Sequence, residues 1–177
     1  MHLHFATVDD ARRIAEIHVV AWQKAYVGIV PADFLATLSV ETREAYWRQE
    51  IPLGKQQVVL AKSGGTTVGW VSYGPSRDED ALPRAAEIWA IYVDPEHWST
   101  GVGRQLWLYA RQQLAQKGYQ SVSLWVLATN ARAIDFYRKA SFQAEPSSTK
   151  EFVLGGATLT EIRYSTTLKI TALAESF

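Results

Sequence analysis

The chain contains no cysteine, and this absence removes several kinds of chemistry at once. Its 177 residues offer no disulfide, no thiolate nucleophile and no zinc site with cysteine ligands. Such a composition is typical of a reducing compartment, so we expect a cytoplasmic location. The four histidines also lack the spacing of a metal site, and we expect no metal.

A net charge and a long apolar run are missing as well. Eighteen Lys and Arg residues balance eighteen Asp and Glu residues, so no overall field draws the molecule to nucleic acid or to an anionic membrane. No apolar stretch approaches the roughly 20 residues that span a bilayer, and the first residues lack the order of a signal peptide. We expect neither nucleic acid nor a membrane as a partner.

Hydrophobic residues make up 47% of the chain, which is enough for a packed core and predicts one domain over residues 1–177, with a tail at 169–177. Segments with strand patterns, alternating or continuously apolar, lie at 2–6, 56–62, 66–73, 87–93, 121–127, 151–154 and 158–166. Segments with helical spacing of apolar residues lie at 11–26, 31–51, 103–117 and 130–140.

The order of these segments predicts the topology. Between residues 87 and 140 a buried strand, a helix, a second buried strand and another helix follow one another, which predicts a parallel crossover. Turns at Gly64-Gly65 and Gly155-Gly156 predict antiparallel hairpins. We therefore expect an α/β fold with a mixed, mostly antiparallel sheet of seven strands, flanked by about four helices.

Gly101 and Gly103 lie between the central strand and the next helix. Glycines there leave backbone N–H groups unshielded, and the helix dipole adds roughly half a positive charge, so such a loop binds anions. The same pattern also forms a tight turn. It is neither a dinucleotide fingerprint nor a Walker loop, because the third glycine of one and the Gly-Lys-Ser/Thr of the other are missing.

Two motifs point to a family. The stretch AEIWAIYVDPEHWSTGVGR at 86–104 resembles the acetyl-CoA motif of the GCN5-related N-acetyltransferases (GNAT), and TNARAIDFYRKASF at 129–142 resembles the second motif of that family. The resemblance implies that the two central parallel strands splay apart and that acetyl-CoA binds in the gap as co-substrate. This sequence departs from the family pattern at Trp98, where Gln or Arg is usual, and at Ser141, where Gly is usual.

The resemblance also places the cofactor contacts on individual positions. The pantetheine arm would pair with the backbone of the central strand and form a hydrogen bond with Asn130 of the second motif, and the pyrophosphate would bind the N–H groups of the glycine loop. The residues implied are Ile91, Tyr92, Val93, Ser99, Thr100, Gly101, Val102, Gly103, Arg104 and Asn130.

Glu87 and Tyr137 are the catalytic residues that the resemblance implies. An alkylammonium with a pKa near ~10.4 must lose a proton at pH 7, which costs roughly 4 to 5 kcal/mol, and Glu87 stands where the family often carries its base. Strand alternation would place it on one face with Trp89 and Ile91. Tyr137 stands where the family's tyrosine protonates the leaving sulfur. A solvated carboxylate and a packed tyrosine are the structural alternatives.

The acceptor site is expected at the first two helices and the first hairpin. Five aromatic residues would wall a pocket for a flat or cationic ligand, although core packing is the better explanation for each one; they are Trp22, Tyr26, Trp70, Tyr73 and Trp89. The acidic run at 78–80 would attract a polyamine or simply form a solvated surface.

Taken together, these features predict an acetyl-CoA-dependent N-acetyltransferase. Because no cysteine exists to carry an acyl group, the acetyl group would pass directly to an amine of a small molecule or peptide within a ternary complex. The alternative is a catalytically silent acetyl-CoA-binding sensor. The acceptor and the oligomeric state stay open, and the exposed hairpin edges are compatible with a homodimer.

Overall fold

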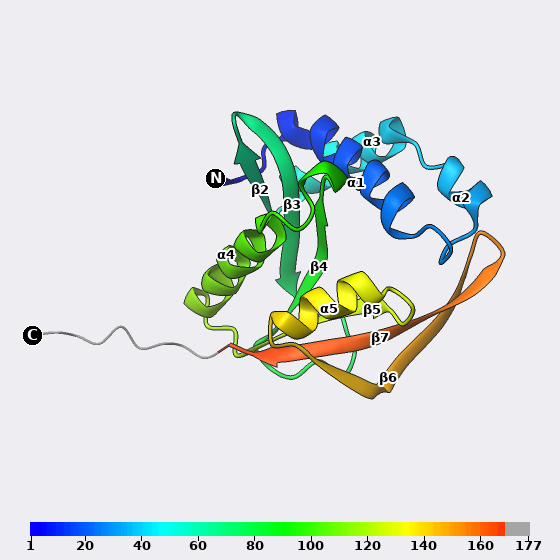
Figure 1. Ribbon diagram of the computed structural model, residues 1–177. Coiled ribbons are helices and arrows are strands. Elements are labelled where there is room, and N and C mark those ends of the chain that lie inside the picture. Colours follow the sequence, from blue (N-terminus) through cyan, green and yellow to red (C-terminus); the bar gives the residue numbers. More distant parts are fainter. Residues whose placement is uncertain (169–177) are drawn as a thin grey trace, which may run out of the picture.

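The computed structural model describes residues 1–168, and the predicted tail at 169–177 lies outside the described residues. The strands are β1 (His2–Phe5), β2 (Gln57–Ser63), β3 (Thr66–Pro75), β4 (Ala85–Val93), β5 (Ser121–Leu127), β6 (Gln143–Leu154) and β7 (Ala157–Thr167) (Figure 1). The helices are α1 (Ala11–Ala25), α2 (Ala32–Ala36), α3 (Val40–Leu53), α4 (Val102–Gln116) and α5 (Ala131–Lys139), with short 3-10 turns at Val8–Asp10 and Pro95–His97.

These strands form one seven-stranded sheet in the order β1-β2-β3-β4-β5-β7-β6. Every neighbouring pair is antiparallel except β4 and β5, which are parallel. The predicted mixed sheet is therefore confirmed. The helices number five among the described residues instead of about four, because the predicted helix at 31–51 is divided. The first part ends at Ala36, and Ser39 caps the second, its hydroxyl accepting a hydrogen bond from the N–H of Thr42 at 3.2 Å.

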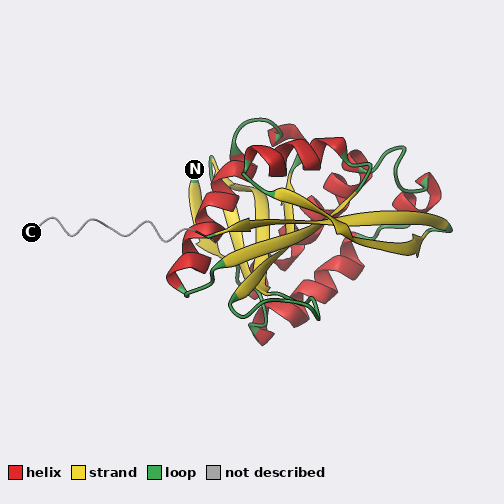
Figure 2. Ribbon diagram, turned by 90° about the horizontal axis from the view of Figure 1, so that it is seen from below, coloured by secondary structure: helices red, strands yellow, loops and turns green. Residues whose placement is uncertain are grey.

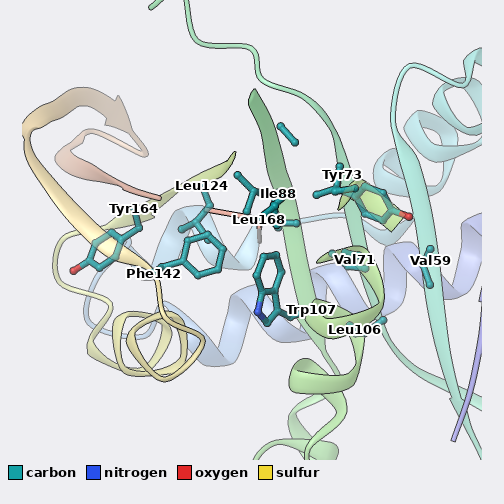
Figure 3. Packing of buried hydrophobic residues seen from close by; sticks show 14 of the residues in the cluster. Val59, Val71, Tyr73, Ile88, Leu106, Trp107, Leu124, Phe142, Tyr164 and Leu168 are labelled. Atoms are coloured by element: carbon teal, nitrogen blue, oxygen red, sulfur yellow. The ribbon is translucent and has the colours of Figure 1, made fainter. Parts of the chain in front are cut away.

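Helices cover both faces of the sheet (Figure 2). On one face, α4 contributes Leu106 and Trp107 to a buried cluster with residues of β2 to β5 (Figure 3). On the other face, Ile14 and Ile17 of α1 and Trp47 of α3 pack against β2 and β3. None of the helices in residues 1–168 is long and apolar enough to cross a membrane.

The pairing of β4 and β5 covers only the first residues of each strand. The registered pairs are Ala85 with Ser121, Ala86 with Val122 and Glu87 with Ser123. Beyond Glu87, β4 continues for six residues to Val93 with β3 on one side, and no strand of residues 1–168 pairs with its other side. The second edge of β4 is therefore unpaired, and the central strands splay apart toward their carboxyl ends.

A β-bulge changes which side chains of β4 share a face. Tyr73 of β3 pairs with Ile88 but the preceding Ser72 pairs with Ala90, so Trp89 is an extra residue on β4. After the bulge, Ile91 packs against the α4 side of the sheet, whereas Ala90 packs against the α1 side. The expectation that Glu87, Trp89 and Ile91 lie on one face is wrong, because alternation holds only in a regular strand.

Candidate active site

The gap between β4 and β5 opens into a cavity of about 1060 Å³. Its walls come from β4 and the loop that follows, from β5 and α5, and at the far end from α1 and the β6–β7 hairpin. Most of the residues singled out from the sequence line it. They are Trp22, Tyr26, Glu87, Trp89, Ile91, Tyr92, Val93, Ser99, Gly101, Gly103, Arg104, Asn130 and Tyr137.

Trp70 and Tyr73 do not line the cavity, contrary to the expectation for the acceptor pocket. Trp70 is fully buried and its indole N–H donates to the carbonyl of Ile14 at 3.2 Å. Tyr73 is 1% exposed and packs in the α4-side cluster. Both belong to β3, which lies inside the sheet between β2 and β4. The helix α4 covers one face of this strand and α1 covers the other.

The glycine loop at residues 99–104 keeps its backbone donors free. None of these six N–H groups donates a hydrogen bond to the residues that the structure describes. Gly101 has φ +90° directly before α4 and directs the chain into the helix, where the positive end of the dipole lies. A Cβ at Gly103 would lie in van der Waals contact with the ring of Phe136 at 3.4 Å, so this part of the loop packs closely on α5.

In two members of this loop the side chain is engaged outside the cavity. The side chain of Val102 is 2% exposed and packs in the core, and the hydroxyl of Thr100 donates to the carbonyl of His97 at 2.7 Å. Neither side chain lines the cavity. Their N–H groups remain available for an anion, together with those of their neighbours.

Trp98 fastens the loop to the end of β4. Its indole N–H donates to the carbonyl of Val93 at 2.8 Å, and the guanidinium of Arg132 lies 4.0 Å from the centre of its ring. Arg104 and Arg132 line this part of the cavity, together with Lys139, whose ammonium is paired with Asp135 at 2.7 Å. The mouth of the cavity therefore carries positive charge beside the free N–H groups.

Asn130 caps α5, with its side-chain oxygen accepting a hydrogen bond from the N–H of Ala133 at 3.1 Å. The residue is 7% exposed and lines the cavity. Its amide nitrogen donates to no group within residues 1–168. One end of this side chain thus fixes the helix, and the other end is left to donate into the cavity.

Tyrosine hydroxyl groups gather in the middle of the cavity. The hydroxyl of Tyr92 accepts a hydrogen bond from the indole N–H of Trp22 at 2.8 Å. Burial, followed by the neighbouring Tyr92, raises the pKa of Tyr137 well above its usual value. Burial and Tyr92 also raise the pKa of Tyr26, with smaller contributions from Tyr137 and Glu161. These phenols are therefore protonated at physiological pH.

Glu87 is buried in an ion pair at the base of the gap. Its side chain is 2% exposed, and Arg77 donates to it from its backbone N–H at 3.0 Å, from Nε at 3.1 Å and from Nη2. The guanidinium of Arg77 also lies 4.3 Å from the centre of the Trp89 ring. A carboxylate bound in this way has much of its negative charge compensated.

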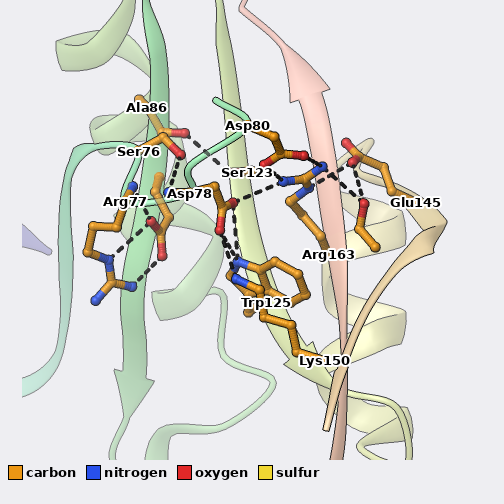
Figure 4. A network of polar contacts seen from close by, with 12 residues as sticks. Ser76, Arg77, Asp78, Asp80, Ala86, Ser123, Trp125, Glu145, Lys150 and Arg163 are labelled. Carbon is orange, nitrogen blue, oxygen red and sulfur yellow. Dashed lines mark hydrogen bonds and ion pairs between the residues drawn. The ribbon is translucent and has the colours of Figure 1, made fainter. Parts of the chain in front are cut away.

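Asp78 and Asp80 of the acidic run at 78–80 are bound by basic side chains of β6 and β7 (Figure 4). Asp78 accepts hydrogen bonds from Lys150, Arg163 and the indole of Trp125 at 3.0 to 3.2 Å, and Asp80 accepts two from Arg163. Burial would raise the pKa of Asp78, but these hydrogen bonds outweigh it and lower that pKa. The run therefore fastens the β3–β4 loop to the sheet.

Glu161 is a cavity residue that the sequence interpretation missed. It lies on β7, opposite Leu127 of β5 and Lys150 of β6. Its carboxylate makes no hydrogen bond or ion pair with residues 1–168. Burial raises its pKa, Lys150 and Arg77 lower it, and Glu87 raises it further. Glu161 reaches the cavity because β7 lies between β5 and β6 in the sheet. No local sequence pattern predicts that strand order.

Comparisons of the sequence decide the family. The pattern of the Acetyltransferase (GNAT) family matches residues 24–142. The uncharacterized N-acetyltransferase YuaI of Bacillus subtilis (strain 168) is 31% identical over 157 residues, which cover 89% of this chain and 87% of YuaI. The chain belongs to the GNAT acetyltransferase family. The resemblance noted at 86–104 and 129–142 is thereby confirmed.

Solved structures share the fold of this GNAT chain. The PaiA N-acetyltransferase from Thermoplasma acidophilum in complex with coenzyme A has a TM-score of 0.71 at 20% identity, covering 91% of this chain and 98% of the other. The structure of yncA from Salmonella typhimurium with its cofactor acetyl-CoA has a TM-score of 0.71 at 23% identity, covering 100% of this chain and 99% of the other. The predicted fold class is confirmed.

The structure accounts for both positions at which this GNAT chain departs from the family pattern. Trp98 replaces the usual Gln or Arg but holds the loop to Val93 through its indole. Ser141 replaces the usual Gly and has φ +68°, in the left-handed region where only glycine is free of strain. The family's preference for glycine there follows from this backbone conformation, and Ser141 adopts it at a small energetic cost.

Proposed function

We propose that the acceptor of this acetyl-CoA-dependent N-acetyltransferase is the amine of a small molecule or peptide. The acetyl group passes to it directly in a ternary complex, because the chain has no cysteine to form an acyl-enzyme. One observation carries this function. The pairing of β4 and β5 stops after Glu87 and Ser123, and the resulting cavity leads to a loop of free N–H groups.

The co-substrate fits the two ends of this cavity. The N–H groups at 99–104 and the charges of Arg104 and Arg132 suit its pyrophosphate and phosphate groups. The unpaired edge of β4 suits its amide-containing arm, which adds to the sheet as a strand would. Since Trp98 already occupies the Val93 carbonyl, the backbone groups of Ile91 carry that pairing.

Tyr137 is placed to hydrogen-bond the sulfur that leaves. Its raised pKa keeps the phenol protonated, and it lines the cavity beside the free amide of Asn130. Full proton transfer from such a phenol would be costly, whereas a hydrogen bond to a developing thiolate stabilises the charge without it.

Glu87, which the family resemblance implies as the base, has a different role in this proposal. Its carboxylate is enclosed by three donors of Arg77, so it anchors the start of the β3–β4 loop to the wall of the cavity. The loop in turn carries Asp78, which binds Lys150 and Arg163. Glu87 thus shapes the acceptor half of the site.

Two measurements test this function. Acetyl-CoA at about 100 times its Kd is expected to raise the free energy of unfolding by about 2.7 kcal/mol. A panel of primary amines is then screened for release of free CoA. If acetyl-CoA does not stabilise the protein, the proposal that acetyl-CoA is its co-substrate is wrong. Stabilisation without CoA release from any amine would favour the silent sensor.

A further inference from the structure

The acceptor half of the cavity contains three carboxylates, and only one of them has no partner among the described residues. Asp78 binds Lys150, Arg163 and Trp125. Glu87 is enclosed by Arg77. Glu161 lines the same cavity without a hydrogen bond or an ion pair within residues 1–168. The negative charge available to an incoming cation is therefore that of Glu161.

The fold directs Glu161 toward the acceptor side. It follows Leu159 by two residues on β7, so the two side chains lie on the same face of the sheet. Leu159 belongs to the cluster that includes Trp22 and Tyr26 of the first helical region. Burial and Tyr92 raise the pKa of Tyr26 most, and Tyr137 and Glu161 add smaller contributions, as expected for groups that surround one space.

The charges that face Glu161 come from three elements. Lys150 is opposite on β6, but its ammonium is bound to Asp78 at 3.0 Å and lies 3.8 Å from the centre of the Trp125 ring. Arg77 and Glu87 face it from the β3–β4 loop and β4, and they compensate each other. No neighbouring cation within residues 1–168 is bonded to Glu161.

We infer that Glu161 is a catalytic residue that binds the ammonium group of the acceptor and removes its proton, and that the acceptor is a monoamine with an apolar or aromatic body. The inference rests on the proposed function. The aromatic walls of the acceptor half suit such a body through stacking and cation-π contact; they are Trp22, Tyr26, Trp89, Trp125 and Phe152. One unpaired carboxylate matches one cationic group.

The proton and electron balance of the step is closed. An ammonium N–H bond breaks and its proton passes to a carboxylate oxygen of Glu161. The nitrogen lone pair forms the new C–N bond at the acetyl carbonyl carbon, and the C–S bond breaks with its electron pair on sulfur. The leaving thiolate is stabilised by a hydrogen bond from Tyr137 and takes up one proton from solvent, while the nitrogen gives up its second proton to solvent and Glu161 releases the first one there as well.

The test compares Glu161→Gln and Glu161→Met with the wild type, using phenethylamine as the acceptor and CoA release as the readout. Both variants are first checked for stabilisation by acetyl-CoA, so a variant that fails to fold leaves the other to decide. Glu151→Gln is the matched control, because Glu151 is an exposed carboxylate on the neighbouring strand β6 and does not line the cavity.

At pH 7, the variants at Glu161 are expected to lose about 100-fold in kcat/KM, with KM raised, while Glu151→Gln is unchanged. The loss should narrow as the pH rises toward the amine pKa near ~10, where solvent removes the proton. Equal pH profiles for wild type and variants would overturn the role of Glu161. A preference of the wild type for spermidine or glutamate over phenethylamine would overturn the substrate class. No CoA release by the wild type with any amine would instead count against the proposed function.

Discussion

Arg77 surrounds the carboxylate of Glu87 with three donors, its own backbone N–H, Nε and Nη2. The relationship is asymmetric, because the Glu87 side chain is 2% exposed whereas that of Arg77 is 54% exposed. A buried charge therefore depends on a partner that solvent reaches. Removing the partner leaves the charge in a poorly solvated place, which is more costly than losing an exposed ion pair.

Arg77→Met is expected to lower the free energy of unfolding by about 3 kcal/mol, because it leaves the Glu87 carboxylate buried and unpaired. Denaturant unfolding at neutral pH measures this. The double variant Arg77→Met/Glu87→Gln loses the same contact with Trp89 but carries no buried charge, so it should be more stable than the single variant. A double variant that is less stable would show that the charge is not the cause.

Tyr137→Phe removes one hydroxyl from the cavity and should lower kcat by about 100-fold with little change in acetyl-CoA binding, because its hydrogen bond is formed only as the sulfur departs. Steady-state CoA release and calorimetric binding give the two quantities. Tyr109→Phe on α4 is the matched control, since its ring packs against Phe5 and lies outside the cavity. An unchanged kcat for Tyr137→Phe would exclude the role in catalysis.

His18 predicts a pH dependence of stability. It is 8% exposed, its two ring nitrogens have no partner, and burial followed by the charge of Arg43 lowers its pKa to about 3. The unfolded chain binds a proton here below pH 6.5 and the folded chain does not. Stability is therefore lost as the pH falls through the window between 6.5 and 3, by about 2 kcal/mol at pH 5.

His18→Phe should remove that contribution, because the phenyl ring fits between the rings of Trp22, Trp70 and Tyr92 and does not titrate. Unfolding free energies at pH 7 and pH 5 test this. The wild type should lose about 2 kcal/mol more than His18→Phe between these values. His2→Gln, at an exposed position, should behave like the wild type. Equal losses in all three proteins would contradict the assignment.

Gly101→Ala separates the backbone conformation of the loop from its packing. A Cβ at Gly101 meets nothing within 4 Å, so the cost comes only from φ +90° and is about 1 kcal/mol. Relaxation of the loop turns its N–H groups, and the Kd for acetyl-CoA should rise about tenfold. Gly65→Ala in the β2–β3 turn has φ +84° and the same open space, so it should cost similar stability without changing the Kd.

Much of this fold was predictable from local patterns. The β2–β3 and β6–β7 hairpins follow from Gly64-Gly65 and Gly155-Gly156 between strand-forming residues. The glycine loop before α4 follows from Gly101 and Gly103. The splaying of the two central strands was expected only from the family resemblance at 86–104, because strand patterns alone say nothing about how far two strands stay paired.

The acceptor half of the site was less predictable, because nonlocal events decide it. The bulge at Trp89 depends on the register with Ser72 and Tyr73 of β3, and it separates Ile91 from the face of Glu87. Trp70 and Trp22 are both aromatic residues that the sequence suggests for an acceptor pocket. Trp70, however, lies on β3, whose two faces are covered by helices, and is fully buried. Arg77 reaches the site because the β3–β4 loop packs against it, and Glu161 reaches it because of the order of the strands. Neither arrangement can be derived from the spacing of residues in the sequence.

Acetyl-CoA is expected to bind along the unpaired edge of β4 and on the free N–H groups of the loop. Amide hydrogen exchange, measured residue by residue with and without acetyl-CoA, tests it most directly. The N–H groups at 99–104 have no partner within residues 1–168, so they should exchange rapidly in the free protein and become protected, together with those on the gap side of β4, when acetyl-CoA is added. Unchanged exchange at 99–104 at saturating acetyl-CoA would contradict the account.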